Sequence, residues 1–276
     1  LAVPTLMAFQ NWDDHDRSNR YTTRLNAQAY LESCDPNAIM FTIGDNDTFP
    51  LWYMQEVEGI RTDVKLVNTS LFATDWYIDQ MKRATYDAPP IPSQLVHDQY
   101  KYGTLDVAYS LDHPRFKDSI MTIKNFMRWI ASDSDVTYVE TENDSKEKFY
   151  PTNKIRIPVN KQKVLENGIV AQKDADKIVP YIDIEIDDRA LFKNRILMLD
   201  ILANNDWERP IYFTGGANAD EEYLWLKDYL QLDGLSYKLV PIKTPMAKKS
   251  LFDMGRIDPE KMYTNIQKWN WRNIND

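Results

Sequence analysis

The stretch AIMFTIGDNDTFPLWYMQEVEGIRTDVKLVNTSL, residues 38–71, decides how this chain folds. An apolar run from Ala38 to Ile43 ends at Gly44, and a second apolar run extends from Val64 to Leu71. Two short apolar runs that flank a helical segment indicate a strand–helix–strand unit. The loop after the first strand of such a unit lies at the carboxyl end of the sheet, where open α/β folds place their sites.

That loop carries two carboxylates and an amide, Asp45, Asn46 and Asp47. Their oxygens are hard ligands of the kind that Mg²⁺ or Ca²⁺ prefers, so Asp45 and Asp47 are candidate metal ligands. The alternative is local structure. Asp47 or Thr48 would cap a helix that Pro50 opens, while Asp45 and Asn46 stabilise the turn. The loop alone leaves both interpretations open.

Composition bounds the class of protein. The chain has 276 residues, 43% of them hydrophobic and 27% charged, as expected for a folded soluble protein with a substantial core. A net charge of -9 argues against a nucleic-acid partner. The single cysteine, Cys34, excludes an internal disulfide and a cysteine zinc cage. No stretch reaches the ~20 apolar residues of a membrane span. The opening LAVPTLMAF, which begins at Leu1, is expected to continue an upstream part of a longer protein.

Further elements follow from the hydrophobic pattern. We expect helices over 20–33 (capped by Ser18 or Asn19), 75–84 and 190–204, the last one amphipathic with Leu191, Ile196, Leu197, Leu199, Ile201 and Leu202 on its apolar side. A strand over 211–214, the Gly215-Gly216 loop, a helix over 220–230 and a strand over 236–242 follow.

Two segments share a sequence pattern. FTIGDNDTFPLW (41–52) and FTGGANADEEYLW (213–225) both carry Phe-Thr, a Gly, an Asn, an Asp and a Leu-Trp. This similarity predicts pseudo-duplicated strand–helix–strand units in one mostly parallel sheet with helices on both faces. We expect a single α/β domain over 1–276.

Residues 86–185 differ from this pattern, and we expect them to form an α+β insertion within the domain. A helix is predicted near 117–131, an acidic surface loop over 132–148, and exposed strands over 154–159 and 181–186.

A second candidate site is NWDDHDRSNR, residues 11–20. Its candidate binding residues are Asp13, His15, Asp16, Arg17 and Arg20. Such dense ionisable clusters occur at metal, phosphate and sugar sites, and a nearby carboxylate raises the pKa of a histidine and orients its ring. Alternatively, the acidic residues precede a helix amino terminus, where negative charge is favourable, and the arginines pair with them.

A third candidate is NTSLFATDWY, residues 68–77, after the second strand. Asn68, Asp75 and Trp76 are candidate ligand-binding residues, because neighbouring strands would bring Asn68, together with Ser70 and Thr74, beside the acidic loop. Trp76 and Tyr77 offer a stacking face for a sugar, although a place in the core is the expectation for both rings. His97 and His113 have no partners at metal-ligand spacing, and the chain contains no nucleophile elbow, phosphate loop or dinucleotide fingerprint.

The chain also resembles a known family. NWDDHDRSNRY, NAIMFTIGDNDTFPLWYMQEVEGIRTDVKLVNTSL, TDWYIDQM, KIRIPV, NDWERPIYFTGG and YLQLDGLSYKLVPI are similar to the soluble region that follows the transmembrane helices in the bacterial "domain of unknown function 2723" family. The resemblance implies a membrane part related to GT-C type glycosyltransferases, including an animal protein O-mannosyltransferase. The resemblance also implies that this chain lies outside the cytoplasm, on the periplasmic side of the inner membrane. It supplies no catalytic residue for this segment.

Three functions follow as hypotheses. The first is an extracytoplasmic accessory domain that binds an acceptor polypeptide or glycan, or braces its own upstream transmembrane domain, through a face built by residues 11–20 and the acidic loop. The second is a metal-dependent hydrolase or transferase that uses Asp13, His15, Asp45 and Asp47. The third is a structural scaffold whose polar clusters are buried hydrogen-bond networks.

Overall fold

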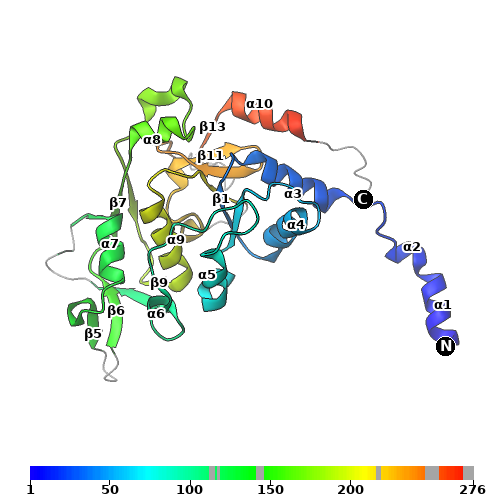
Figure 1. Cartoon of the computed structure of the whole chain (residues 1–276), viewed down its shortest axis with the longest axis horizontal. Coiled ribbons are helices and arrows are strands. Elements are labelled where there is room, and N and C mark those ends of the chain that lie inside the picture. Colours follow the sequence, from blue (N-terminus) through cyan, green and yellow to red (C-terminus); the bar gives the residue numbers. More distant parts are fainter. Residues whose placement is uncertain (112–115, 117–118, 141–145, 216–218, 246–254, 270–276) are drawn as a thin grey trace.

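Three β-sheets and the helices around them form the fold (Figure 1). The structure is a computed structural model, and it describes residues 1–111, 116, 119–140, 146–215, 219–245 and 255–269. His113, Gly216 and part of the helix predicted near 117–131 therefore lie outside the described residues.

The largest sheet has six strands in the order β13-β11-β12-β10-β1-β2. Their bounds are β1 (Ile39–Thr42), β2 (Lys65–Asn68), β10 (Ile211–Phe213), β11 (Leu230–Asp233), β12 (Ser236–Leu239) and β13 (Arg256–Ile257). Strand β1 runs parallel to both β2 and β10, whereas β12 is antiparallel to β10 and β11.

The predicted strand–helix–strand unit is confirmed. Helix α4 (Asp45–Glu56) connects β1 to β2, and Phe41 is the register partner of Val67. Every residue of both strands is buried, as in parallel strands that are covered on both faces.

Two smaller sheets lie beside the large one. One has the order β5-β6-β3-β9 and the other β4-β7-β8. Their bounds are β3 (Val107–Ser110), β4 (Met121–Thr122), β5 (Tyr138–Glu140), β6 (Lys146–Tyr150), β7 (Lys154–Pro158), β8 (Tyr181–Glu185) and β9 (Ala190–Phe192). Strands β7 and β8 confirm the strands predicted over 154–159 and 181–186. Most of these strands fall within residues 86–185, and the insertion itself stays a prediction.

The remaining helices surround these sheets. They are α1 (Ala2–Gln10), α2 (Trp12–His15), α3 (Thr22–Ser33), α5 (Asp75–Met81), α6 (His97–Tyr100), α7 (Ile123–Ile130), α8 (Lys161–Glu166), α9 (Lys193–Asn205) and α10 (Pro259–Lys268). Short 3₁₀ helices are η1 (Leu71–Ala73), η2 (Asp135–Thr137), η3 (Gln172–Lys177), η4 (Asp220–Tyr223) and η5 (Lys227–Tyr229).

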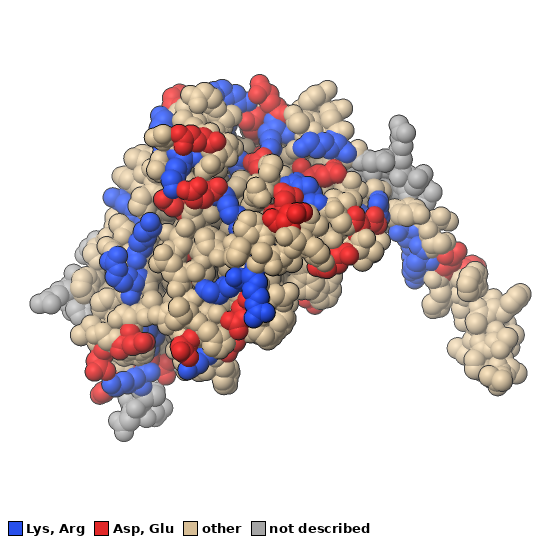
Figure 2. Space-filling view, in the orientation of Figure 1, with Lys and Arg blue, Asp and Glu red and all other residues tan. Residues whose placement is uncertain are grey.

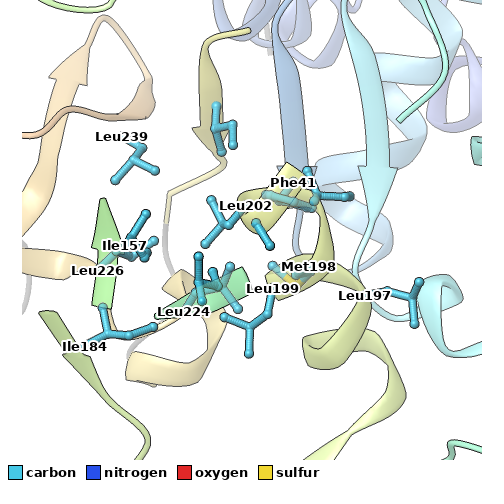
Figure 3. Packing of buried hydrophobic residues seen from close by; sticks show 14 of the residues in the cluster. Phe41, Ile157, Ile184, Leu197, Met198, Leu199, Leu202, Leu224, Leu226 and Leu239 are labelled. Carbon is cyan, nitrogen blue, oxygen red and sulfur yellow. The ribbon is translucent and has the colours of Figure 1, made fainter. Parts of the chain in front are cut away.

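Helices cover both faces of the parallel strands, as predicted. Met40 of β1 packs with Leu31 of α3 and Leu51 of α4 on one face. Phe41 points to the other face, where it packs with Leu202 of α9 (Figure 3). This core continues to β7 and β8 of the three-stranded sheet and to β3, β6 and β9 of the four-stranded sheet, so one hydrophobic cluster joins all three sheets.

Several details differ from the prediction. Each sheet combines parallel and antiparallel pairs, so the sheets are mixed, and β10, β1 and β2 are three adjacent strands that form the expected parallel arrangement. Residues 220–230 form the short 3₁₀ helices η4 and η5 instead of one continuous helix, because Leu224 and Trp225 have positive φ angles that a right-handed helix excludes. The pseudo-duplication is therefore not confirmed.

Three other elements of the structure differ from the predicted ones. The amphipathic helix over 190–204 begins at Lys193, since Leu191 belongs to β9, and nearly all of α9 is buried. Part of the loop predicted over 132–148 is the antiparallel pair β5 and β6. Helix α3 has Tyr21 at its amino-terminal cap position, without a side-chain cap from Ser18 or Asn19.

Candidate functional site

The acidic loop turns out to be the first turn of helix α4. Gly44 has φ +79° and ψ -177°, a conformation that essentially only glycine adopts, and the helix begins at the next residue. Pro50 lies inside α4, so the prediction that it opens the helix is wrong. Asp45 and Asp47 sit at the helix amino end, where negative charge is favourable.

Buried hydroxyl and amide groups hold this turn against the sheet. The Thr48 hydroxyl donates to the Gly44 carbonyl at 2.6 Å and lies 2.6 Å from the Thr42 hydroxyl. The Asn68 amide donates to the same Thr48 oxygen at 2.8 Å. Asn68 therefore lies beside the acidic turn, as predicted from the strand order, but it is fully buried and joins β2 to α4.

The three polar side chains of the turn have different environments. Asp47 is half-buried and its Oδ2 accepts a hydrogen bond from the Thr214 hydroxyl at 2.7 Å. Burial raises the pKa of Asp47, and hydrogen bonds from Thr214 and the Ile43 amide offset this only in part. Asp45 and Asn46 are exposed. Among the described residues, no group of three or more His, Cys, Asp or Glu side chains is arranged to hold a metal ion.

The structure does not bring residues 11–20 to the acidic turn. Residues 1–20 are exposed throughout and form an arm that carries α1 and α2 away from the sheets (Figure 1). Within this cluster His15 Nδ1 lies 2.9 Å from the Asn11 carbonyl oxygen, and Arg17 donates to the Asp14 carbonyl at 2.8 Å. Hydrogen bonds from Ser18 lower the pKa of Asp16.

The predicted residues after β2 separate as well. Ser70 is exposed, and Thr74 donates its hydroxyl to the Leu71 carbonyl at 2.7 Å. Asp75 accepts from the Tyr102 amide at 2.7 Å and faces Lys193 rather than the acidic turn. Of the polar candidates in this segment, Asn68 lies beside the acidic turn, whereas Ser70, Thr74 and Asp75 do not bond to it.

The expected core position of Trp76 is wrong, whereas that of Tyr77 is confirmed. Trp76 is 58% exposed and Tyr77 is 1% exposed. The two rings contact each other edge to face, with centroids 5.5 Å apart. The Tyr77 hydroxyl accepts a hydrogen bond from the Asn68 backbone amide at 2.8 Å, so this ring anchors α5 to β2.

Trp76 forms one wall of a groove of about 290 Å³ between α4, α5 and strand β2. Trp52 of α4 also lines the groove, together with Val64 and with Lys65 and Leu66 of β2. The other lining residues, several of them polar, are Gln55, Glu56, Thr62, Tyr77, Gln80, Met81, Thr85 and Ala88. The groove thus combines indole faces with amide, carboxylate and hydroxyl groups.

A buried amine lies at the sheet side of this groove. Lys65 is 2% exposed, and its Nζ donates to the Arg83 carbonyl at 2.7 Å and to Thr85 Oγ1 at 2.8 Å. Burial and repulsion from Arg209 lower the pKa of Lys65 to about 8. Glu56, on the same groove, bonds to the Tyr86 hydroxyl through its carboxylate.

Trp52, Gln80 and Lys65 are not among the site residues predicted from the sequence, although the sequence contains a signal for them. Each helix carries a tryptophan with a glutamine about one turn later, Trp52 with Gln55 and Trp76 with Gln80. Side chains three or four positions apart lie on one helix face. Both helices flank β2, so the two pairs face a common space.

Comparison with known proteins identifies the family. The family model described as TMEM260-associated domain 2 matches residues 23–261. No curated protein and no solved structure matches the chain. Within the described residues, no helix is both long enough and apolar enough to cross a bilayer. The match covers most of the chain, which therefore belongs to the TMEM260-associated domain 2 family.

Proposed function

We propose that the chain is an extracytoplasmic accessory domain of a multi-pass membrane glycosyltransferase-like protein, and that it binds the glycan of an acceptor in the groove between α4, β2 and α5. The family match and the sequence resemblance described above support the link to a membrane protein. The observation that supports glycan binding is that Trp52 and Trp76 line the same groove, together with polar side chains.

The chemistry of the groove fits a sugar. The C–H faces of a pyranose ring pack on indole rings, while its hydroxyl groups need donors and acceptors at the edges. Gln80 and Thr62 supply such groups, and Glu56 adds a carboxylate acceptor. A volume of about 290 Å³ is at the lower end for ligand pockets, which suits one or two sugar units better than a folded partner.

The composition of the exposed arm supports a contact between this chain and the membrane part of the same protein. The first eleven residues, LAVPTLMAFQN, carry no charge, and α1 has no acidic or basic residue at its ends. Leu6, Met7 and Phe9 are all more than half exposed. The end of the arm accordingly shows neither blue nor red atoms in Figure 2. A helix that is apolar all round requires an apolar environment, such as lipid or the transmembrane helices of the same protein.

Glycan binding is tested with Trp76. A glycan array probed with the purified domain, followed by titration of the best ligand, gives the affinity of the wild-type chain. We expect Trp76→Ala to weaken binding about tenfold, ~1.4 kcal/mol. The matched control is Tyr263→Ala on α10, because Tyr263 is similarly exposed (67%) and belongs to another element. Equal affinities for wild type and Trp76→Ala would refute the proposal.

A further inference from the structure

Lys65 is a buried cation without a counter-ion in the described part of the chain. Its two hydrogen-bond acceptors, the Arg83 carbonyl and the Thr85 hydroxyl, are both neutral. No carboxylate of the described residues forms an ion pair with it. Buried charges in proteins are normally paired, because removal from water costs several kcal/mol per ion.

A second cation adds to the positive potential there. Arg209 donates to the carbonyls of Asn37 and Pro90, at 2.7 and 3.0 Å, and no described carboxylate pairs with it. Burial lowers the pKa of Arg209 to about 10, and this guanidinium repels Lys65. Glu56 also lines the groove, but it is exposed to solvent, which screens its charge.

The ammonium group of Lys65 has an unused donor. Nζ carries three N–H groups, and Arg83 and Thr85 take two of them. Lys65 is also one of the residues that line the groove. A ligand in the groove that carries a negative charge would supply both the missing acceptor and the missing counter-ion.

We infer that the groove takes a saccharide with a carboxylate, such as a hexuronic acid unit, whose carboxylate faces Lys65 while its ring packs against the tryptophans that line the groove, Trp52 and Trp76. This inference rests on the proposed glycan binding and adds the chemical class of the sugar. The charge-assisted hydrogen bond from Lys65 distinguishes the acid from the neutral hexose with the same ring.

The test compares matched pairs of ligands by calorimetric titration. The methyl glycosides of glucuronic acid and glucose form one pair, and those of galacturonic acid and galactose form the other. We expect the acid of at least one pair to bind about tenfold more tightly than its neutral counterpart at pH 7, ~1.4 kcal/mol. Lys65→Met should bring that ratio close to one.

Lys148→Met is the matched control variant. Lys148 is buried to the same degree (4% exposed), and it too bonds to a backbone carbonyl, of Ser132, and to a threonine hydroxyl, of Thr137. Its pKa is also lowered to about 8 by burial. Because it lies on β6 rather than beside the groove, its replacement should leave the preference for the acid unchanged.

A measurement on the wild-type chain covers the case in which Lys65→Met does not fold. The preference for the acid should decline between pH 7 and 9.5, because the Lys65 ammonium loses its proton in that range. Equal binding of acid and neutral sugar, or a preference that Lys65→Met retains, would overturn the inference and leave glycan binding standing. If no sugar of the array or of these pairs binds, the proposed function fails, and the inference fails with it.

Discussion

The Asp47 carboxylate accepts a hydrogen bond from the Thr214 hydroxyl at 2.7 Å, which joins the first turn of α4 to the end of β10. These residues are far apart in sequence, and neither the carboxylate nor the hydroxyl is fully exposed. The acidic turn is thereby attached to two strands, through Thr48 to β1 and through Asp47 to β10. Asp47 thus has a structural role in the described fold.

Thr214→Val should destabilise the chain by ~1–3 kcal/mol, because it removes the hydroxyl donor of the half-buried Asp47 carboxylate, which then keeps only the Ile43 amide, while the side-chain volume is kept. The free energy of unfolding in urea measures this loss. Asn46→Ala, on the exposed side of the same turn, should change it by less than ~0.5 kcal/mol. A Thr214→Val chain as stable as wild type would contradict the assignment.

Gly44→Ala should cost ~1–3 kcal/mol of unfolding free energy, because its φ of +79° with an extended ψ is strained for any residue that has a Cβ. The space around Gly44 is open, so a clash would not contribute. Denaturant unfolding of Gly44→Ala is to be compared with that of Ser70→Ala, an exposed residue after the neighbouring strand. Similar stabilities for the two variants would show that the backbone conformation at Gly44 carries no strain.

The sequence predicts the strand–helix–strand unit well and the start of its helix poorly. The apolar runs of β1 and β2 are local signals, and strands buried on both faces require them. Pro50 suggested a later helix start, since proline is common in the first turn. The chain instead tolerates Pro50 inside α4, after a helix start that depends on the φ angle of Gly44. Backbone angles of this kind are not visible in a residue pattern.

Long-range contacts explain the other differences. Lys193 and Asp200 give α9 the appearance of having an exposed side, yet both are buried. Lys193 pairs with Asp106, and Asp200 accepts from the Gln94 and Leu95 amides, partners that no local pattern indicates. Trp76 was expected in the core from its residue type alone. The groove depends on the packing of α4 and α5 around β2, so only the three-dimensional structure places Trp52 and Lys65 with Trp76.

Acid should weaken the fold through Asp35. Burial raises the pKa of Asp35, but the ammonium groups of Lys238 and Lys261 outweigh this and lower it to about 2. A carboxyl whose pKa is lower in the folded state stabilises the fold above its unfolded pKa, near 3.8, and loses that contribution as the pH falls toward 2. Asp35→Asn should therefore be less stable than wild type at pH 7, and the difference should shrink between pH 4 and 2.

Thermal unfolding at a series of pH values measures this effect. The buried Asp233, whose pKa is raised by burial and also by the Asp35 charge, acts in the opposite direction, so Asp35→Asn is compared with its parent in an Asp233→Asn background as well. Asp98→Asn is the control, because the Asp98 side chain is 85% exposed. A stability difference between Asp35→Asn and wild type that stays constant down to pH 2 would contradict the prediction.

The arm should bind lipid. Replacement of Leu6 and Phe9 by serine removes two exposed apolar side chains from α1, each of which contributes ~1.5–3 kcal/mol when fully buried. We expect the double variant to sediment with phosphatidylcholine vesicles at least about tenfold less than wild type. Tyr263→Ser, which removes an exposed ring from α10, is the control. Absence of vesicle binding by the wild-type chain, or binding that the double variant retains, would contradict a lipid contact of α1.

Alkaline pH should strengthen the fold through the two buried lysines. Burial lowers the pKa of both Lys65 and Lys148 to about 8, so between pH 8 and the ordinary lysine pKa of 10.5 the unfolded chain binds more protons than the folded one. Stability then rises with pH, by roughly 1–2 kcal/mol per lysine between pH 8 and 9.5.

Urea unfolding of Lys65→Met, Lys148→Met and the double variant separates the two contributions. Each single variant should lose about half of the contribution that the pair makes to the rise, and the double variant all of that contribution, because the sites lie on different sheets and their effects should add. Lys82, whose pKa burial lowers, adds to the rise and Cys34, whose pKa burial raises to about 12, opposes it, so the differences between each variant and wild type are compared. The comparison stops at pH 9.5, since several buried tyrosines with raised pKa values, Tyr77 among them, act in the opposite direction above that range. If Lys65→Met keeps the full rise, the Lys65 ammonium of the wild-type chain is already paired in the folded state, and the groove has no missing counter-ion for an anionic ligand to supply.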